Sequence, residues 1–162
     1  MSQFNDLAAA DEMMRHTHEM VMVPRFWTSF SSGGTPALSW STFPFKETSR
    51  SAIPEQPGVY AFLIAPAVAG DLNVSYLMYI GETERTLRDR FGDYLLEAKS
   101  DRIRPKLLRI LPLYPDHLLF ACAPVPAGVP PKEVESALLD AFLPPGNDQV
   151  PATVRRVRKA LR

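Results

Sequence analysis

The chain has 162 residues, of which 46% are apolar, and its 18 basic side chains balance its 18 acidic ones. A chain of this length can bury a core as one domain, and its low net charge and 10% aromatic content argue against a disordered protein. A single cysteine, Cys122, excludes an intramolecular disulfide and a multi-cysteine zinc site. Every apolar run is shorter than the roughly 18 residues of a membrane span and no secretory signal is visible, so we expect a cytoplasmic protein without membrane contact.

The N-terminal third combines an expected helix with an aromatic-rich segment. Asn5 or Asp6 can cap a helix to about residue 20, and the candidates for its buried side are Leu7, Met13, Met14 and Met20. Residues 24–57 are rich in Ser, Thr, Pro and Gly, but they include six aromatic residues, Phe26, Trp27, Phe30, Trp40, Phe43 and Phe45. Because a disordered linker rarely carries so many aromatic residues, we expect an irregular segment that wraps onto the domain and offers a candidate surface for a protein partner.

The middle of the chain predicts three strands. Residues 58–65 and 74–83 are largely apolar and aromatic, and the turn formers Gly70, Asp71 and Asn73 separate them, which is typical of a β-hairpin with a long loop. Residues 117–125 predict a third strand. We therefore expect a mixed α/β (α+β) fold in which a small three-stranded antiparallel sheet is flanked by helices.

Helices are expected between and after these strands. Thr86 can cap a helix that runs to about residue 100, with Arg90 near the edge of a buried face formed by Leu87, Phe91, Tyr94 and Leu95. A short helix is expected at residues 106–111. Prolines suit the start of a further helix at residues 130–131, whose apolar face holds Val134, Leu138, Ala141 and Phe142. A basic helix from about residue 152 completes the order.

Several of these elements carry a recognisable pattern. Gly58-Val59-Tyr60 and Tyr79-Ile80-Gly81 on paired strands, followed by the sequence LRDRF at residues 87–91, resemble the opening of a GIY-YIG nuclease domain, as found in excision-repair and homing endonucleases. Glu135 is followed by Pro144 and Asn147 at a spacing that resembles the glutamate helix and asparagine turn of the excision-repair branch. The resemblance covers about residues 57–148, between an N-terminal helix and wrapping segment (1–56) and a basic C-terminal helix (149–162) of one globular unit.

The resemblance implies a metal-dependent endonuclease that hydrolyses DNA phosphodiester bonds. Glu135 would hold a single divalent cation, Mg²⁺ or Mn²⁺, and one carboxylate suffices when the substrate phosphate supplies further ligands. The planar fork of Arg90 would bind the scissile phosphate. Of Tyr60 and Tyr79, one would act as general base and the other would orient water or metal ligands, and the sequence does not decide between them. A nearby cation must favour the phenolate of the base, because an ordinary tyrosine has a pKa near ~10.

Three positions would have structural roles, and several features depart from the family pattern, two of which bear directly on the site. Gly58 and Gly81 belong to the strand motifs, and Asn147 would tie down the turn after the glutamate helix. The spacing from Tyr79 to Arg90 is one residue longer than the commonest one, so the assignment of Arg90 assumes an extra loop residue. Glu82 stands where many members have lysine, and its carboxylate would repel phosphate unless it faces away or shares the metal.

Two basic blocks interrupt an otherwise acidic chain. Residues 85–109 hold eight basic and four acidic side chains, and residues 151–162 hold five basic side chains and no acidic one. Such blocks favour a phosphate-facing stripe or, equally, solvated helix faces. Candidate nucleic-acid contacts are Arg85, Arg88, Arg155, Arg156, Arg158 and Lys159, although a solvated surface position is favoured for the first two. The alternative to a nuclease is a GIY-YIG-like module that binds nucleic acid or protein without cutting.

Overall fold

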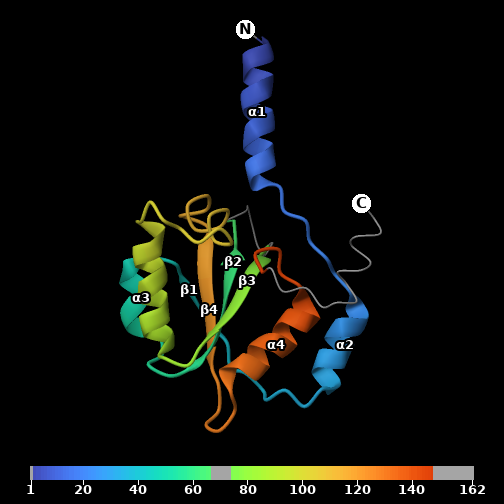
Figure 1. The fold of residues 1–162 in the computed structure, drawn as a ribbon, viewed down its shortest axis with the longest axis vertical. Coiled ribbons are helices and arrows are strands. Elements are labelled where there is room, and N and C mark those ends of the chain that lie inside the picture. Colours follow the sequence, from blue (N-terminus) through green and yellow to red (C-terminus); the bar gives the residue numbers. More distant parts are fainter. Residues whose placement is uncertain (1, 67–73, 148–162) are drawn as a thin grey trace.

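A four-stranded antiparallel sheet organises the fold (Figure 1). The computed structural model describes residues 2–66 and 74–147, with the strand order β1-β4-β2-β3. The strands are β1 (Ser41–Pro44), β2 (Gly58–Ile64), β3 (Tyr76–Thr83) and β4 (Leu118–Pro124). The expected mixed α/β class is therefore confirmed, and so are the hairpin strands and the third strand near residues 117–125.

The expectation of three strands is wrong, because β1 adds a fourth strand at the outer edge of β4. Phe43 of β1 lies opposite Phe120, and the four-residue strand is mostly exposed. A short edge strand with little apolar alternation gives no strand signal of its own, so only its pairing with β4 defines it. The segment before residue 57 therefore belongs to the same sheet as the predicted nuclease domain.

Helix α3 (Leu87–Ala98) covers one face of the sheet. Its N-terminus is capped as expected, because the Thr86 hydroxyl accepts a hydrogen bond from the Asp89 backbone N–H at 3.0 Å. The predicted buried face is confirmed for Leu87, Phe91, Tyr94 and Leu95. The 3₁₀ helix η1 (Glu47–Ala52) lies against α3, and the adjoining Phe45 and Ile53 are buried in the same core.

Helix α4 (Pro131–Phe142) covers the opposite face, and α2 (Pro24–Ser32) packs beside it (Figure 1). The rings of Phe30 and Phe142 meet edge to face with centroids 6.0 Å apart. Residues 24–57 are thus not an irregular segment throughout, since they form α2, β1 and η1. Pro24 occupies the first turn of α2, where its missing N–H has no helical partner to lose. On α4, Val134, Leu138 and Ala141 are buried as expected, while Phe142 is partly exposed.

Helix α1 (Ser2–His16) projects away from the rest of the chain (Figure 1). It ends before the predicted residue 20, and the expected buried side is wrong, since Met13 and Met14 are 72% and 65% exposed and Met20 is also exposed. The side chain of Leu7 lies outside the described part of the chain. Near the end of α1, the Arg109 guanidinium donates hydrogen bonds to the carbonyls of Met14, Arg15 and Thr17.

The connection between α3 and β4 consists of turns, so the helix expected at residues 106–111 does not form. Leu107, Ile110 and Leu111 are nevertheless buried in the core shared with α3. Their apolar spacing therefore reflects burial within turns and not a helix. The predicted basic helix from residue 152 and most of the hairpin loop lie outside the described residues. Across residues 2–66 and 74–147, no helix has the length and hydrophobicity needed to cross a lipid bilayer.

Candidate active site

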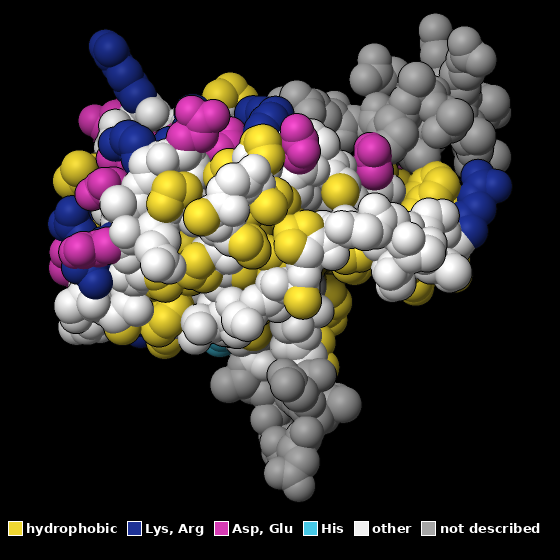
Figure 2. Space-filling model, turned by 90° about the horizontal axis from the view of Figure 1, so that it is seen from below, with side chains coloured by type: hydrophobic (Ala, Val, Ile, Leu, Met, Phe, Trp, Pro, Cys, Tyr) yellow, Lys and Arg dark blue, Asp and Glu magenta, His cyan; other side chains and the backbone are white. Residues whose placement is uncertain are grey.

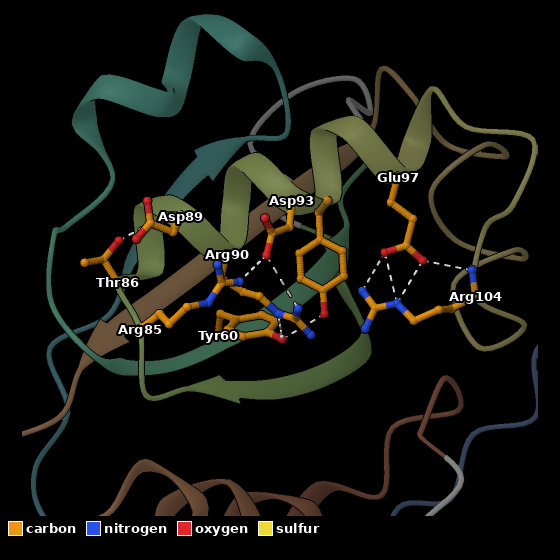
Figure 3. A network of polar contacts seen from close by, with 9 residues as sticks. Tyr60, Arg85, Thr86, Asp89, Arg90, Asp93, Glu97 and Arg104 are labelled. Atoms are coloured by element: carbon orange, nitrogen blue, oxygen red, sulfur yellow. Dashed lines mark hydrogen bonds and ion pairs between the residues drawn. The ribbon is translucent and has the colours of Figure 1, made fainter.

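A hydrogen bond joins Tyr60 and Arg90 in the candidate site (Figure 3). Tyr60 lies on β2 and is almost fully buried, while Arg90 comes from the first turn of α3. The Arg90 Nε donates a hydrogen bond to the Tyr60 hydroxyl at 3.0 Å, and that hydroxyl shares a second hydrogen bond of 2.7 Å with the Tyr94 hydroxyl. The guanidinium also lies over the Tyr94 ring, 4.8 Å from its centroid. These contacts fix the orientation of Arg90, whose side chain remains 24% exposed.

Both motif glycines permit close approaches that no other residue would allow. A Cβ on Gly81 would lie 2.5 Å from the Tyr60 hydroxyl oxygen, so the glycine makes room for this ring across the β2–β3 pair. A Cβ on Gly58 would lie 2.4 Å from the carbonyl oxygen of Ala123 on β4. The glycines of the two motifs therefore serve the packing of the sheet and the placement of Tyr60.

Tyr79 lies on β3 with its ring centroid 6.4 Å from that of Tyr60. Burial raises the pKa of Tyr60 to about 12, and the neighbouring Tyr79 adds to this effect, whereas Arg90 opposes it. Burial, and then Tyr94, raise the pKa of Tyr79 above its ordinary range. Both tyrosines are thus neutral phenols at neutral pH. Among the protein groups, burial outweighs the lowering effect of Arg90 on the pKa of Tyr60, and the lowering of a tyrosine pKa by a bound divalent cation stays a prediction.

A network of charged side chains extends along α3 from Arg90 (Figure 3). Asp93 forms an ion pair with Arg85 and lies 3.8 Å from the Arg90 Nη1. At the other end of α3, Glu97 accepts hydrogen bonds from the backbone N–H and the guanidinium of Arg104. The Arg104 guanidinium covers the Tyr94 ring at 4.9 Å from its centroid. Two guanidinium groups, those of Arg90 and Arg104, therefore flank Tyr94.

The two neighbouring arginines differ from Arg90 in their contacts. The guanidinium of Arg88 donates to the carbonyls of Ile53 and Ser51, both at 2.9 Å, and forms an ion pair with Glu55. These bonds join η1 and the residues that follow it to α3, and they occupy the guanidinium of Arg88, while its role in DNA contact stays a prediction. Arg85 is an exposed residue whose guanidinium is paired with Asp93. Arg155, Arg156, Arg158 and Lys159 lie outside the described residues.

Glu135 belongs to α4, which covers the face of the sheet opposite to α3. Its side chain is buried, with 7% of the residue exposed, and its Oε2 forms an ion pair with Lys132 one helical turn earlier. Its negative charge acts on Tyr79 and on Glu82, since it contributes to the raised pKa of each. These interactions connect Glu135 to the edge strand β3, where Glu82 also interacts electrostatically with Arg90.

Glu82 follows Gly81 near the end of β3. Its Oε2 is buried and has no hydrogen-bond partner. Burial raises the pKa of Glu82, and the like charge of Glu135 raises it further. Carboxylate oxygens are the ligands that Mg²⁺ prefers, so a buried carboxylate beside an unsatisfied carboxylate oxygen fits a divalent cation. Within the described ranges, no group of three or more His, Cys, Asp or Glu residues is arranged around a common metal position, so a cation here would also need water or substrate ligands.

Asn147 ties the turn after α4 to the edge strand β3. The backbone N–H of Ile80 donates to the Asn147 Oδ1 at 2.9 Å, and the Asn147 Nδ2 donates to the Ile80 carbonyl at 2.8 Å. In this way the amide side chain satisfies the backbone of an edge strand as a neighbouring strand would. The backbone N–H of Gly146 binds the Met78 carbonyl at 2.8 Å beside it.

Two hollows lie beside this polar group rather than within it. One of about 510 Å³ lies between α2, α4 and the sheet, and its lining is mostly apolar, including Phe30, Leu38, Trp40 and Leu138. Another of about 790 Å³ includes Pro57, Pro124, Val129 and Pro131 at the end of the molecule seen in Figure 2, where hydrophobic side chains gather near the middle of the face. Neither is lined by Tyr60, Arg90 or Glu135, so polar contacts rather than a cavity define the candidate site.

Sequence reasoning placed Tyr94 in the core and gave no role to Lys132 or Arg104. Tyr94 follows Arg90 by four residues and Lys132 precedes Glu135 by three, and both spacings bring side chains together on one helix face. Arg104 lies in the turns after α3, where no local pattern indicates its contact with Glu97.

Comparisons of this chain with protein-family models, with curated proteins and with solved structures find no match.

Proposed function

We propose that the protein is a metal-dependent endonuclease of the GIY-YIG type that hydrolyses DNA phosphodiester bonds. The observation that supports this proposal is that an oriented, partly exposed guanidinium and a buried carboxylate both interact electrostatically with Glu82 on the edge strand β3. Arg90 is held by Tyr60 on the α3 side, and Glu135 is buried on the α4 side. Metal-dependent phosphodiester hydrolysis can use this combination of positive charge for the phosphate and a carboxylate for a hard cation.

Arg90 would bind the scissile phosphate. Its Nε is already used by the Tyr60 hydroxyl, so its terminal nitrogens would contact phosphate oxygens, with Nη1 exchanging its ion pair with Asp93 for the phosphate. Interaction with Tyr60 also outweighs the effect of burial and raises the pKa of Arg90, so its positive charge is constant at any working pH. A guanidinium fixed before substrate binds loses little entropy on binding, which favours stabilisation of the transition state.

Without a bound cation, Tyr60 and Tyr79 are neutral hydrogen-bonding groups, since their pKa values are raised. A cation beside one of them would be needed for it to act as general base. Tyr60 would hold Arg90 in place, and Tyr79 would orient water or a metal ligand near Glu135. Glu135 would bind Mg²⁺ or Mn²⁺, which when bound supplies a water of lowered pKa and charge stabilisation at the phosphate. A DNA partner and a cytoplasmic location are parts of the same proposal.

The test is incubation of the purified protein with supercoiled, linear, branched and single-stranded DNA, in Mg²⁺ or in EDTA. The proposal predicts that at least one of these substrates is cut in Mg²⁺ and that none is cut in EDTA. Cleavage that continues in EDTA would contradict the metal dependence. A protein that binds DNA in the same buffers but cuts none of the substrates would instead support a binding module.

That binding module is the second candidate function. The apolar hollow between α2 and α4 favours it, because Trp40 and Phe142 are partly exposed along its lining and belong to no part of the polar site. In such a module, substitution of Trp40 would weaken binding of the partner while substitution of Glu135 would have no effect. DNA binding by the Trp40 variant and DNA cleavage by the Glu135 variant, measured together, separate the two functions: a nuclease keeps its DNA affinity without Trp40 and loses cleavage without Glu135.

A further inference from the structure

Glu82 is the unsatisfied charged group of the site. Its Oε2 is buried without a hydrogen-bond partner near the end of β3. An unpaired buried carboxylate oxygen is costly, because the protein offers nothing to replace the hydrogen bonds lost from water. Such an atom in a folded protein calls for a ligand or an ion.

The position of Glu82 on the sheet brings it to Glu135. Side chains alternate along β3, so Glu82 shares a face with Ile80, and Ile80 belongs to the cluster that α4 covers. Glu135 projects from the first half of that helix, and its charge acts on Glu82. Two carboxylates from different elements thus face the same region between β3 and α4.

Lys132 compensates only one of these carboxylates. Its ammonium forms an ion pair with Glu135 and acts on Glu82 through its charge, but no hydrogen bond joins it to Glu82. The group of three therefore carries one positive and two negative charges when Glu82 is ionised. A divalent cation matches this charge better than an ammonium, and its ligand shell can use the free Oε2.

We propose that Glu82 is a second carboxylate ligand of the divalent cation at Glu135, and that the Lys132 ammonium stands in that position until the cation displaces it. This inference rests on the proposed function and extends it, since the resemblance provides one carboxylate and has lysine at the position of Glu82. Two carboxylates are within the number that Mg²⁺ accepts from a protein, and water or substrate phosphate completes the shell.

The test measures Mn²⁺ binding to the whole chain without DNA, by electron paramagnetic resonance of the free ion. Glu82→Gln keeps the shape of the side chain and removes its charge, and it should weaken binding on the order of tenfold or more. Glu84→Gln is the matched control, because Glu84 is an exposed carboxylate two residues further on. Its affinity for Mn²⁺ should stay within about twofold of the unsubstituted protein.

Thermal unfolding provides a second readout that does not depend on catalysis. Without metal, Glu82→Gln should raise the melting temperature, because it removes an unpaired buried charge beside Glu135. Added Mn²⁺ should raise the melting temperature of the unsubstituted protein and leave that of Glu82→Gln nearly unchanged. A side chain with only a structural role would not give opposite effects in the two conditions.

Comparison with Glu135→Gln separates this inference from the proposed function. Unchanged Mn²⁺ affinity in Glu82→Gln together with lost affinity in Glu135→Gln would overturn the role of Glu82 and leave the cation at Glu135. Unchanged affinity in both variants would overturn both proposals. Equal losses in Glu82→Gln and Glu84→Gln would indicate a general effect of surface charge and would also overturn the role of Glu82.

Discussion

Arg90 differs from the other arginines near it in what its guanidinium contacts. Arg88 is bound to backbone carbonyls in η1 and directly after it, and Arg85 is paired with Asp93 at the surface. Arg90 alone of these three is bound through its Nε by Tyr60, and its Nη1 lies 3.8 Å from an Asp93 carboxylate oxygen. The assignment of Arg90 assumed one extra residue in the loop between Tyr79 and Arg90, and the hydrogen bond of Arg90 to Tyr60 is consistent with that assumption.

The first prediction uses this difference. Arg90→Ala should reduce the rate of DNA cleavage on the order of 10²-fold or more, as expected for loss of a charge that stabilises the transition state. Arg85→Ala is the matched control and should change the rate by less than about threefold. Single-turnover cleavage measures both. An equal loss in the two variants would contradict a special role for Arg90, whereas Arg88→Ala is an unsuitable control because it also removes contacts of the fold.

A second prediction concerns Gly81. Gly81→Ala places a Cβ against the Tyr60 hydroxyl, so the ring must move and its bonds to Arg90 and Tyr94 must break. The free energy of unfolding should fall by about 1–3 kcal/mol, which is typical of overpacking in a core. Urea unfolding measures this change. Unchanged stability would mean that the Tyr60 ring has space that the structure does not show.

At the scale of elements, the end of α3 is joined to the following turns by Glu97 and Arg104. Burial of Glu97 opposes its charge, but hydrogen bonds from Arg104 outweigh this effect and hold the pKa below its ordinary value of 4.5. A carboxyl with a lowered folded-state pKa stabilises the fold above its unfolded pKa, and this contribution is lost as the pH falls through the folded value.

The third prediction follows from that sign. At pH 7, Glu97→Gln should be less stable to urea than the unsubstituted protein, and the difference should shrink steadily as the pH falls below about 4.5. Glu47→Gln is a control, because Glu47 forms only an exposed ion pair with Arg50. A stability difference for Glu97→Gln that is constant between pH 7 and pH 3 would contradict the assignment.

Elements with a strong local signal were predicted well from the sequence. The hairpin strands, α3 with its Thr86 cap and α4 each have a clear apolar period or a capping residue. Elements defined by tertiary contacts were missed. The strand β1 depends on pairing with β4, and the turns near residue 107 bury apolar side chains at a spacing that imitates a helix. The methionines of α1 suggested a buried side, but Met13 and Met14 are exposed in the described part of the chain.

The candidate site shows the same division. Tyr60, Tyr79, Arg90 and Glu135 could be selected because a motif with fixed spacing contains them. The groups that tune them could not, since Arg104 and Lys132 act through contacts that depend on the folded chain. The raised pKa of Tyr60 also could not be predicted from the sequence, because it results mainly from burial of the side chain in the folded protein.

At the scale of the whole molecule, the structure describes the basic side chains of residues 85–109 but not those of residues 151–162. In residues 85–109, Arg85, Arg88, Arg104 and Arg109 are engaged in contacts within the chain. This leaves fewer cations for DNA in that block than its composition indicated. The basic residues 151–162, which lie outside the described part, therefore become the main candidates for contacts to the phosphate backbone.

The fourth prediction tests residues 151–162. A chain that ends at Val150 should still cleave DNA at saturating enzyme, but it should bind DNA more weakly and with a shallower slope of log affinity against log salt concentration. Each phosphate contact that is lost should reduce the slope by about one. Fluorescence anisotropy at several salt concentrations measures this slope. An unchanged slope would favour a solvated helix or a protein-docking segment instead.

The most direct test of the account compares the unsubstituted protein with Glu135→Gln on its best DNA substrate in Mg²⁺, with binding and cleavage measured on the same samples. Glutamine keeps the shape of the buried side chain but is a weak ligand for a hard cation. The account predicts that cleavage is abolished while affinity for DNA stays within a few-fold. Full cleavage by Glu135→Gln would contradict the proposed metal site and the mechanism built on it.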